Sequence, residues 1–98
     1  MDAWVDTGSS YTWVPADILR ELGVSPAGRR EFDTAGGQII QREVAETLIR
    51  VEGAVYTTIV VFGDPATPPL IGAVTLETFG LAVDPLHHRL IPVRALAL

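Results

Sequence analysis

The alternation of apolar and polar residues predicts a chain built mainly from short strands. From Ala45 to Val51 every second residue is apolar or β-branched, which is typical of a strand with one buried face. Residues 55–62 are β-branched or aromatic on both faces, which indicates a central strand covered on both sides. Because such runs are interrupted by glycine and proline, the pattern favours an all-β fold, a small closed barrel.

Short helices and hairpins are predicted between these strands. Residues 15–22 carry apolar side chains at helical spacing and end at Gly23, and residues 74–79 form one to two helical turns before Gly80. A later pair of strand-like runs, 81–84 and 89–93, forms a hairpin at the end of the chain.

The composition indicates one globular domain spanning residues 1–98. Its 98 residues are 48% hydrophobic, which is enough for a core, and the absence of cysteine excludes disulfides and thiolate metal sites. His87 and His88 are adjacent on a predicted hairpin, so they point to opposite sides, and no third ligand is close in sequence. We therefore expect a solvated turn there, with no metal and no cofactor.

The charge pattern argues against nucleic acid as a partner. The net charge is −5, and the seven basic residues are scattered along the chain, with only Arg29 and Arg30 adjacent. No stretch approaches the length of a membrane span, and Met1-Asp2 begins with an acid where a secretory signal carries positive charge. The expected location is cytoplasmic, without a membrane partner.

One stretch carries candidate chemistry, Val5-Asp6-Thr7-Gly8-Ser9-Ser10. A carboxylate that leaves an apolar strand for a sharp polar turn has to be held by hydrogen bonds. Together with Trp13-Val14-Pro15, the segment Asp6 to Ser10 resembles the active-site turn of aspartic proteases. The later sequence Leu70-Ile71-Gly72 resembles the apolar-apolar-glycine segment of the same family, and the resemblance implies that it lies directly beside the catalytic turn. The short chain is most similar to the single-domain retropepsins.

The resemblance implies an aspartic endopeptidase with a closed retropepsin-like barrel. Peptide hydrolysis by this route needs two carboxylates, one that takes a proton from water and one that donates a hydrogen bond to the carbonyl. Since one chain supplies one such motif, Asp6 would meet Asp6 of a second copy in a symmetric homodimer, and the two would titrate as a coupled pair. Asp33-Thr34-Ala35-Gly36 is a superficial second copy in which alanine replaces the glycine.

The resemblance implies supporting roles for the residues around the catalytic Asp6. Thr7 would hydrogen-bond to the turn of the other subunit, the Gly8 backbone would hold the carboxylate, and the Ser9 hydroxyl would donate to an Asp6 oxygen. In pepsin-like members the tryptophan at the position of Trp13 supports the flap.

A flap over the substrate is also implied. Strand-like runs flank Thr34-Ala35-Gly36-Gly37-Gln38, whose glycines suit a tight turn. The substrate would be an extended peptide or protein segment that pairs as an added strand. Its apolar side chains would enter pockets formed by four apolar residues: Ile39, Ile40, Val74 and Leu76.

One departure from the family leaves alternatives open. The family has an amino-terminal strand pair before the catalytic turn that this sequence lacks, so either the start is truncated or the apolar tail Arg94–Leu98 replaces it at the dimer interface. A catalytically silent dimerisation or peptide-binding module with the same fold is the alternative to a protease. A fragment of a longer polyprotein or membrane-linked protease is another.

Overall fold

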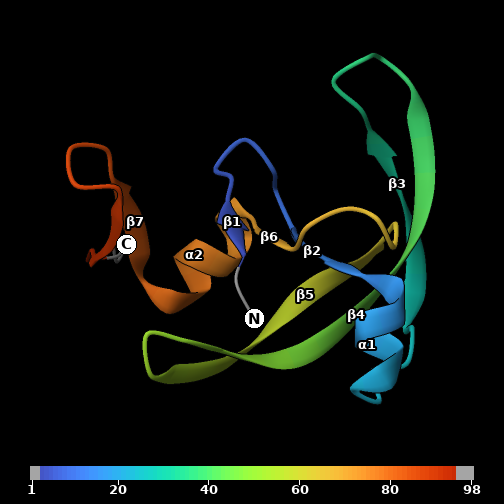
Figure 1. Cartoon of the computed structure of the whole chain (residues 1–98), viewed down its shortest axis with the longest axis horizontal. Helices are drawn as coiled ribbons and strands as arrows, with labels where there is room; N and C mark the ends of the chain where they lie inside the picture. The colour runs from blue at the N-terminus through green and yellow to red at the C-terminus, as the bar shows by residue number, and fades with distance from the viewer. Residues whose placement is uncertain (1–2, 95–98) are drawn as a thin grey trace.

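The computed structural model describes residues 3–94, which form an all-β protein with two short helices, as predicted (Figure 1). The strands are β1 (Trp4–Val5), β2 (Thr12–Pro15), β3 (Gly28–Asp33), β4 (Ile39–Val51), β5 (Ala54–Gly63), β6 (Leu70–Ile71), β7 (Leu81–Asp84) and β8 (Arg89–Pro92). The helices are α1 (Ala16–Glu21) and α2 (Ala73–Phe79). Neither of these helices is long and apolar enough to cross a membrane.

Six of the strands form one sheet in the order β1-β6-β2-β5-β4-β3. β6 lies between β1 and β2, parallel to the first and antiparallel to the second, and so brings the late part of the chain beside its beginning. In the described part of the chain β1 and β3 each have one partner and are edge strands. Within residues 3–94 these two edges are not paired with each other, and β1 pairs with β6 through Trp4–Leu70 and Val5–Ile71.

The core lies where α1 packs against the sheet. Val14, Leu19, Ala45, Val60 and Phe62 form its buried cluster, which joins β2, α1, β4 and β5. Burial of such side chains contributes roughly 1.5–3 kcal/mol each. The core therefore fixes β2, the strand that leaves the Asp6 turn.

β4 is one continuous strand of 13 residues, where the sequence pattern suggested two successive runs. Its first half pairs with β3 from Ile39 to Val44, and its second half pairs with β5 from Val44 to Val51. The β3–β4 hairpin is thus a direct extension of a core strand, and Figure 1 shows it rising from the body of the molecule.

The expectation that residues 55–62 are covered on both sides is correct only for the second half of β5. Val55, Tyr56 and Thr57 are exposed, whereas most residues from Thr58 onward are buried. The reason is the register: only the second half lies between β4 and β2, and the first half extends beyond β2 as a two-stranded ribbon with β4.

β7 and β8 form the predicted terminal hairpin as a separate two-stranded sheet. Asp84 holds its turn, because Oδ1 accepts from the Leu86 amide at 3.0 Å and Oδ2 lies 2.7 Å from His87 Nδ1. The hydrogen bond from His87, followed by that from the Leu86 backbone, lowers the pKa of Asp84. In residues 3–94 no cluster of three potential metal-binding side chains includes either histidine. The tail segment 95–98, expected at a dimer interface, lies outside the described residues.

Candidate active site

Asp6 lies in a tight turn directly after β1 and is held mainly by backbone groups. Its amide donates to the Ile71 carbonyl at 3.0 Å, and its carbonyl accepts from the Ser9 amide at 3.1 Å. The Gly8 amide donates to Asp6 Oδ1 at 2.9 Å. A Cβ at position 8 would lie 3.2 Å from that oxygen, so glycine permits the close approach. The carboxylate is therefore oriented by the chain while remaining exposed.

Ser9 does not make the hydrogen bond expected from the sequence. Its hydroxyl donates to the Tyr11 carbonyl at 2.9 Å instead of to the Asp6 carboxylate. A hydroxyl has one proton to donate, and the local turn uses it two residues further along the chain. Ser9 thus supports the shape of the turn, and the proposed donation to Asp6 is wrong for this structure.

The amino terminus of α2 holds the Asp6 turn through backbone hydrogen bonds and forms a clamp on it. The amides of Ala73 and Val74 donate to the carbonyls of Ser9 and Ser10 at 2.8 and 2.9 Å. These amides belong to the first turn of the helix, where backbone donors lack partners inside the helix. The segment Leu70-Ile71-Gly72 lies beside the turn as the sequence predicted, and Gly72 makes the close approach possible.

A buried threonine cluster lies behind this clamp. Thr75 Oγ1 is 2.6 Å from Thr12 Oγ1 and 2.9 Å from Thr58 Oγ1. Thr12 Oγ1 also accepts from the Gly72 amide at 3.1 Å. Because the three side chains come from α2, β2 and β5, the cluster ties the helix that clamps the turn to the two core strands. This cluster was not predicted from the sequence.

Thr75→Val should lower the free energy of unfolding by about 1–3 kcal/mol, because it keeps the shape but removes the hydroxyl that joins the other two. Thr78→Val on the same helix is the matched control, since its hydroxyl bonds an α2 carbonyl at the exposed surface. We expect the control to change stability by about 0.5 kcal/mol or less. Urea denaturation of both variants measures the difference in unfolding free energy. Equal losses in the two variants would show that the buried cluster contributes no more to stability than the exposed Thr78 hydroxyl.

Aromatic side chains join the turn to the β3–β4 hairpin. The ring of Phe32 on β3 lies 5.1 Å from that of Trp13 and 6.2 Å from that of Tyr11. Trp13 therefore contacts the hairpin through Phe32, although the hairpin turn carries no tyrosine. Neither Tyr11 nor Phe32 was singled out from the sequence. The position of Phe32 just before the predicted turn was an available signal.

The hairpin turn forms at Thr34–Gln38, as expected. The Thr34 amide donates to the Gln38 carbonyl at 2.8 Å, and the Gly37 amide to the Thr34 carbonyl at 3.0 Å, with Gly37 at a φ of +82°. Thr34 is partly buried and Ala35, Gly36, Gly37 and Gln38 are exposed, and none of these five residues borders the hollow that contains Asp6.

The hollow beside Asp6 measures about 630 Å³ and lies between the turn and β3. Its walls include Tyr11, Trp13, Arg30 and Phe32. Four residues were named for apolar substrate pockets, and none of them borders this hollow: Ile39, Ile40, Val74 and Leu76. Leu76 is buried in the packing of α2, whereas Ile39 lies beyond the turn and is exposed.

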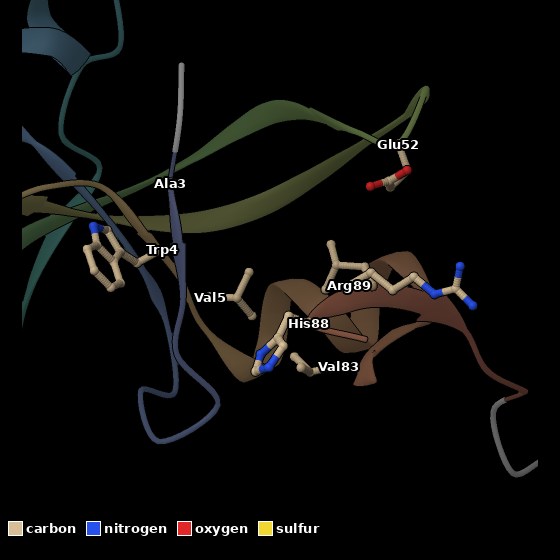
Figure 2. A pocket seen from close by; sticks show the side chains of 8 residues that line it. Ala3, Trp4, Val5, Glu52, Val83, His88 and Arg89 are labelled. Atoms are coloured by element: carbon tan, nitrogen blue, oxygen red, sulfur yellow. The ribbon is translucent and has the colours of Figure 1, made fainter. Parts of the chain in front are cut away.

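A second hollow of about 740 Å³ lies between β1 and the β7–β8 hairpin (Figure 2). Trp4 and Val5 border it from β1, and Val83, His88 and Arg89 border it from the β7–β8 hairpin. The Trp4 side chain is 69% exposed. Large exposed aromatic side chains of this kind are enriched at protein interfaces.

Within residues 3–94, Asp6-Thr7-Gly8 is the one copy of the motif that lies in a turn held by the α2 clamp. The superficial copy beginning at Asp33 lies at the end of β3 and in the hairpin turn, away from the α2 clamp that holds Asp6. A water activated between two such turns would require a second copy of the chain.

Comparison with known proteins agrees with this geometry. The family described as Aspartyl protease matches residues 1–87. A solved foamy viral protease-reverse transcriptase in complex with an RNA/DNA hybrid is similar in fold, with a TM-score of 0.63 and 18% sequence identity. The match covers 97% of this chain and 11% of that one. No curated protein matches significantly. The chain belongs to the aspartyl protease family and has its retropepsin-like, all-β fold.

Proposed function

We propose that the protein is an aspartic endopeptidase whose active species is a symmetric homodimer. The observation that carries this proposal is the held and exposed carboxylate of Asp6. The Gly8 amide orients it, the α2 terminus clamps its turn, and it opens into a hollow walled by an edge strand.

The mechanism uses the two Asp6 side chains of the dimer as a pair. Two carboxylates a few ångströms apart do not both ionise readily, so one is ionised and one protonated. The ionised group takes a proton from water as the water attacks the peptide carbonyl, and the protonated group donates to the developing oxyanion. Collapse of the tetrahedral intermediate, with a proton delivered to the leaving nitrogen, separates the two peptides.

Thr7 and the β3–β4 hairpin complete the proposed site. Thr7 is exposed on the turn, and its side chain makes no hydrogen bond within residues 3–94, so it is free to bond across to the other subunit. The hairpin at Thr34–Gln38 acts as the flap. The outer edge of β3 has unpaired backbone groups, which suit an extended peptide added as a further strand.

The hollow next to β1 supports dimerisation. Trp4 and Val5 are exposed two residues and one residue before the catalytic carboxylate, so a partner that covers them would also approach Asp6. The tail Arg94–Leu98 is proposed to extend this interface. Removing Ala95–Leu98 should then weaken association in sedimentation experiments.

The test is hydrolysis of an unfolded protein as a function of enzyme concentration. Specific activity should rise with concentration and reach a plateau where sedimentation reports a dimer, because the monomer holds half of the catalytic pair. A dimer that binds peptide without cleaving it would identify the silent module instead. Full specific activity of a monomer would rule out the shared site.

A further inference from the structure

Arg30 is a cation on the wall of the Asp6 hollow that the fold does not neutralise. Three other arginines, Arg20, Arg42 and Arg89, each form an ion pair with a carboxylate. Within residues 3–94 Arg30 forms none, as is also true of Arg29 and Arg50, but of these three only Arg30 borders the Asp6 hollow. Its guanidinium lies over the ring of Tyr11, 5.2 Å from the centroid, and donates to the phenol oxygen. The positive charge of the Arg30 guanidinium can therefore attract a negatively charged group of a bound molecule.

The contacts of Arg30 hold it in place without consuming its capacity to donate. A guanidinium has five N–H donors, and the Tyr11 oxygen takes one of them. The contacts with the Tyr11 ring and its phenol oxygen restrict the side chain, which lowers the entropy lost on binding a further group. The remaining donors form the fork that carboxylates bind with two oxygens.

The side of β3 from which Arg30 projects is the side that faces the hollow. Arg30 and Phe32 are two residues apart, so they share a strand face, and both contact Tyr11. Glu31 and Asp33 also border the hollow, but alternation directs their side chains to the opposite face from Arg30. The positive charge therefore acts locally, beside one position of a bound chain.

We propose that Arg30 is a specificity-determining residue that binds a glutamate or aspartate side chain of the substrate. This inference depends on the proposed peptidase function. A peptide that pairs with the free edge of β3 presents alternate side chains along that strand, and one of them lies beside Arg30. The rest of the groove, next to Asp6 in a protein of net charge −5, does not attract acidic residues.

The test is competitive hydrolysis of a peptide set in which glutamate, glutamine or lysine is placed at each position in turn, at about pH 6, where glutamate is ionised. At one position the wild type should cleave the glutamate peptide about three- to tenfold faster in kcat/KM than the glutamine peptide. The preference should shrink when salt is raised to about 0.5 M, because salt screens exposed charges.

Arg30→Glu should reverse the preference at that position towards lysine. Arg29→Glu is the matched control, because it makes the same change of charge on the opposite face of β3, outside the Asp6 hollow, and should keep the preference for glutamate. Equal cleavage of glutamate and glutamine peptides by the wild type, or an unchanged preference in Arg30→Glu, would overturn the inference. Absence of cleavage of any peptide would instead count against the peptidase function itself.

Discussion

Asp6→Asn should lower kcat/KM for peptide hydrolysis by roughly a thousandfold or more while leaving the protein folded and dimeric. Asparagine keeps the size of the side chain, and its carbonyl oxygen can still accept from the Gly8 amide. It cannot accept a proton from water, and general acid–base catalysis of this kind contributes about 10²–10⁴-fold. Measurement of kcat/KM, with circular dichroism and sedimentation as checks, separates lost chemistry from lost structure.

A mixing experiment tests whether the Asp6 side chains of two subunits share one active site. Asp6→Asn added in excess to the wild type should inhibit it, because exchange converts active dimers into heterodimers with one competent carboxylate. Asp33→Asn is the comparison, since Asp33 opens the superficial second copy of the motif. Loss of hydrolysis in Asp33→Asn with retention in Asp6→Asn would show that the catalytic assignment is wrong.

The parts of the site that could be predicted from the sequence are those fixed by local chemistry. The turn at Asp6 follows from a polar run after an apolar strand, and the hairpin at Gly36-Gly37 from glycines between strand-like runs. The placement of Leu70-Ile71-Gly72 beside the turn came from the family resemblance, because no local pattern reports that β6 enters the sheet between β1 and β2.

The parts that could not be predicted depend on contacts between distant residues or on exact loop geometry. Thr12 and Thr75 are 63 positions apart, and nothing in either neighbourhood indicates that their hydroxyls meet. Arg30 and Tyr11 are 19 positions apart, and their contact depends on how β3 packs against the residues that follow the Asp6 turn. The choice of the Ser9 hydroxyl between two nearby acceptors depends on the exact conformation of the turn, which composition does not fix.

Gly72→Ala should be the most damaging small substitution in the described chain, lowering the free energy of unfolding by about 3 kcal/mol or more. A Cβ added there would lie 2.8 Å from the Ser9 carbonyl oxygen and 2.5 Å from the Tyr11 carbonyl carbon. Both are backbone atoms, so no side chain can rotate away. Relief requires the Asp6 turn to move off α2, which breaks the bonds from the Ala73 and Val74 amides to the Ser9 and Ser10 carbonyls.

Gly28→Ala is the matched control, because nothing lies within 4 Å of the Cβ it would add. That substitution should be neutral or slightly stabilising, since alanine restricts the unfolded chain. Urea denaturation compares the stability of the two variants. The rate of peptide hydrolysis per folded molecule of Gly72→Ala should also be lower than that of the wild type. The free energy of unfolding of a domain of this size is only about 5–15 kcal/mol. Poor expression of Gly72→Ala together with normal expression of Gly28→Ala would therefore also indicate the predicted destabilisation. If Gly72→Ala is as stable and active as the wild type, close contact between the Asp6 turn and the α2 terminus is not required. The α2 clamp would then not be what orients Asp6.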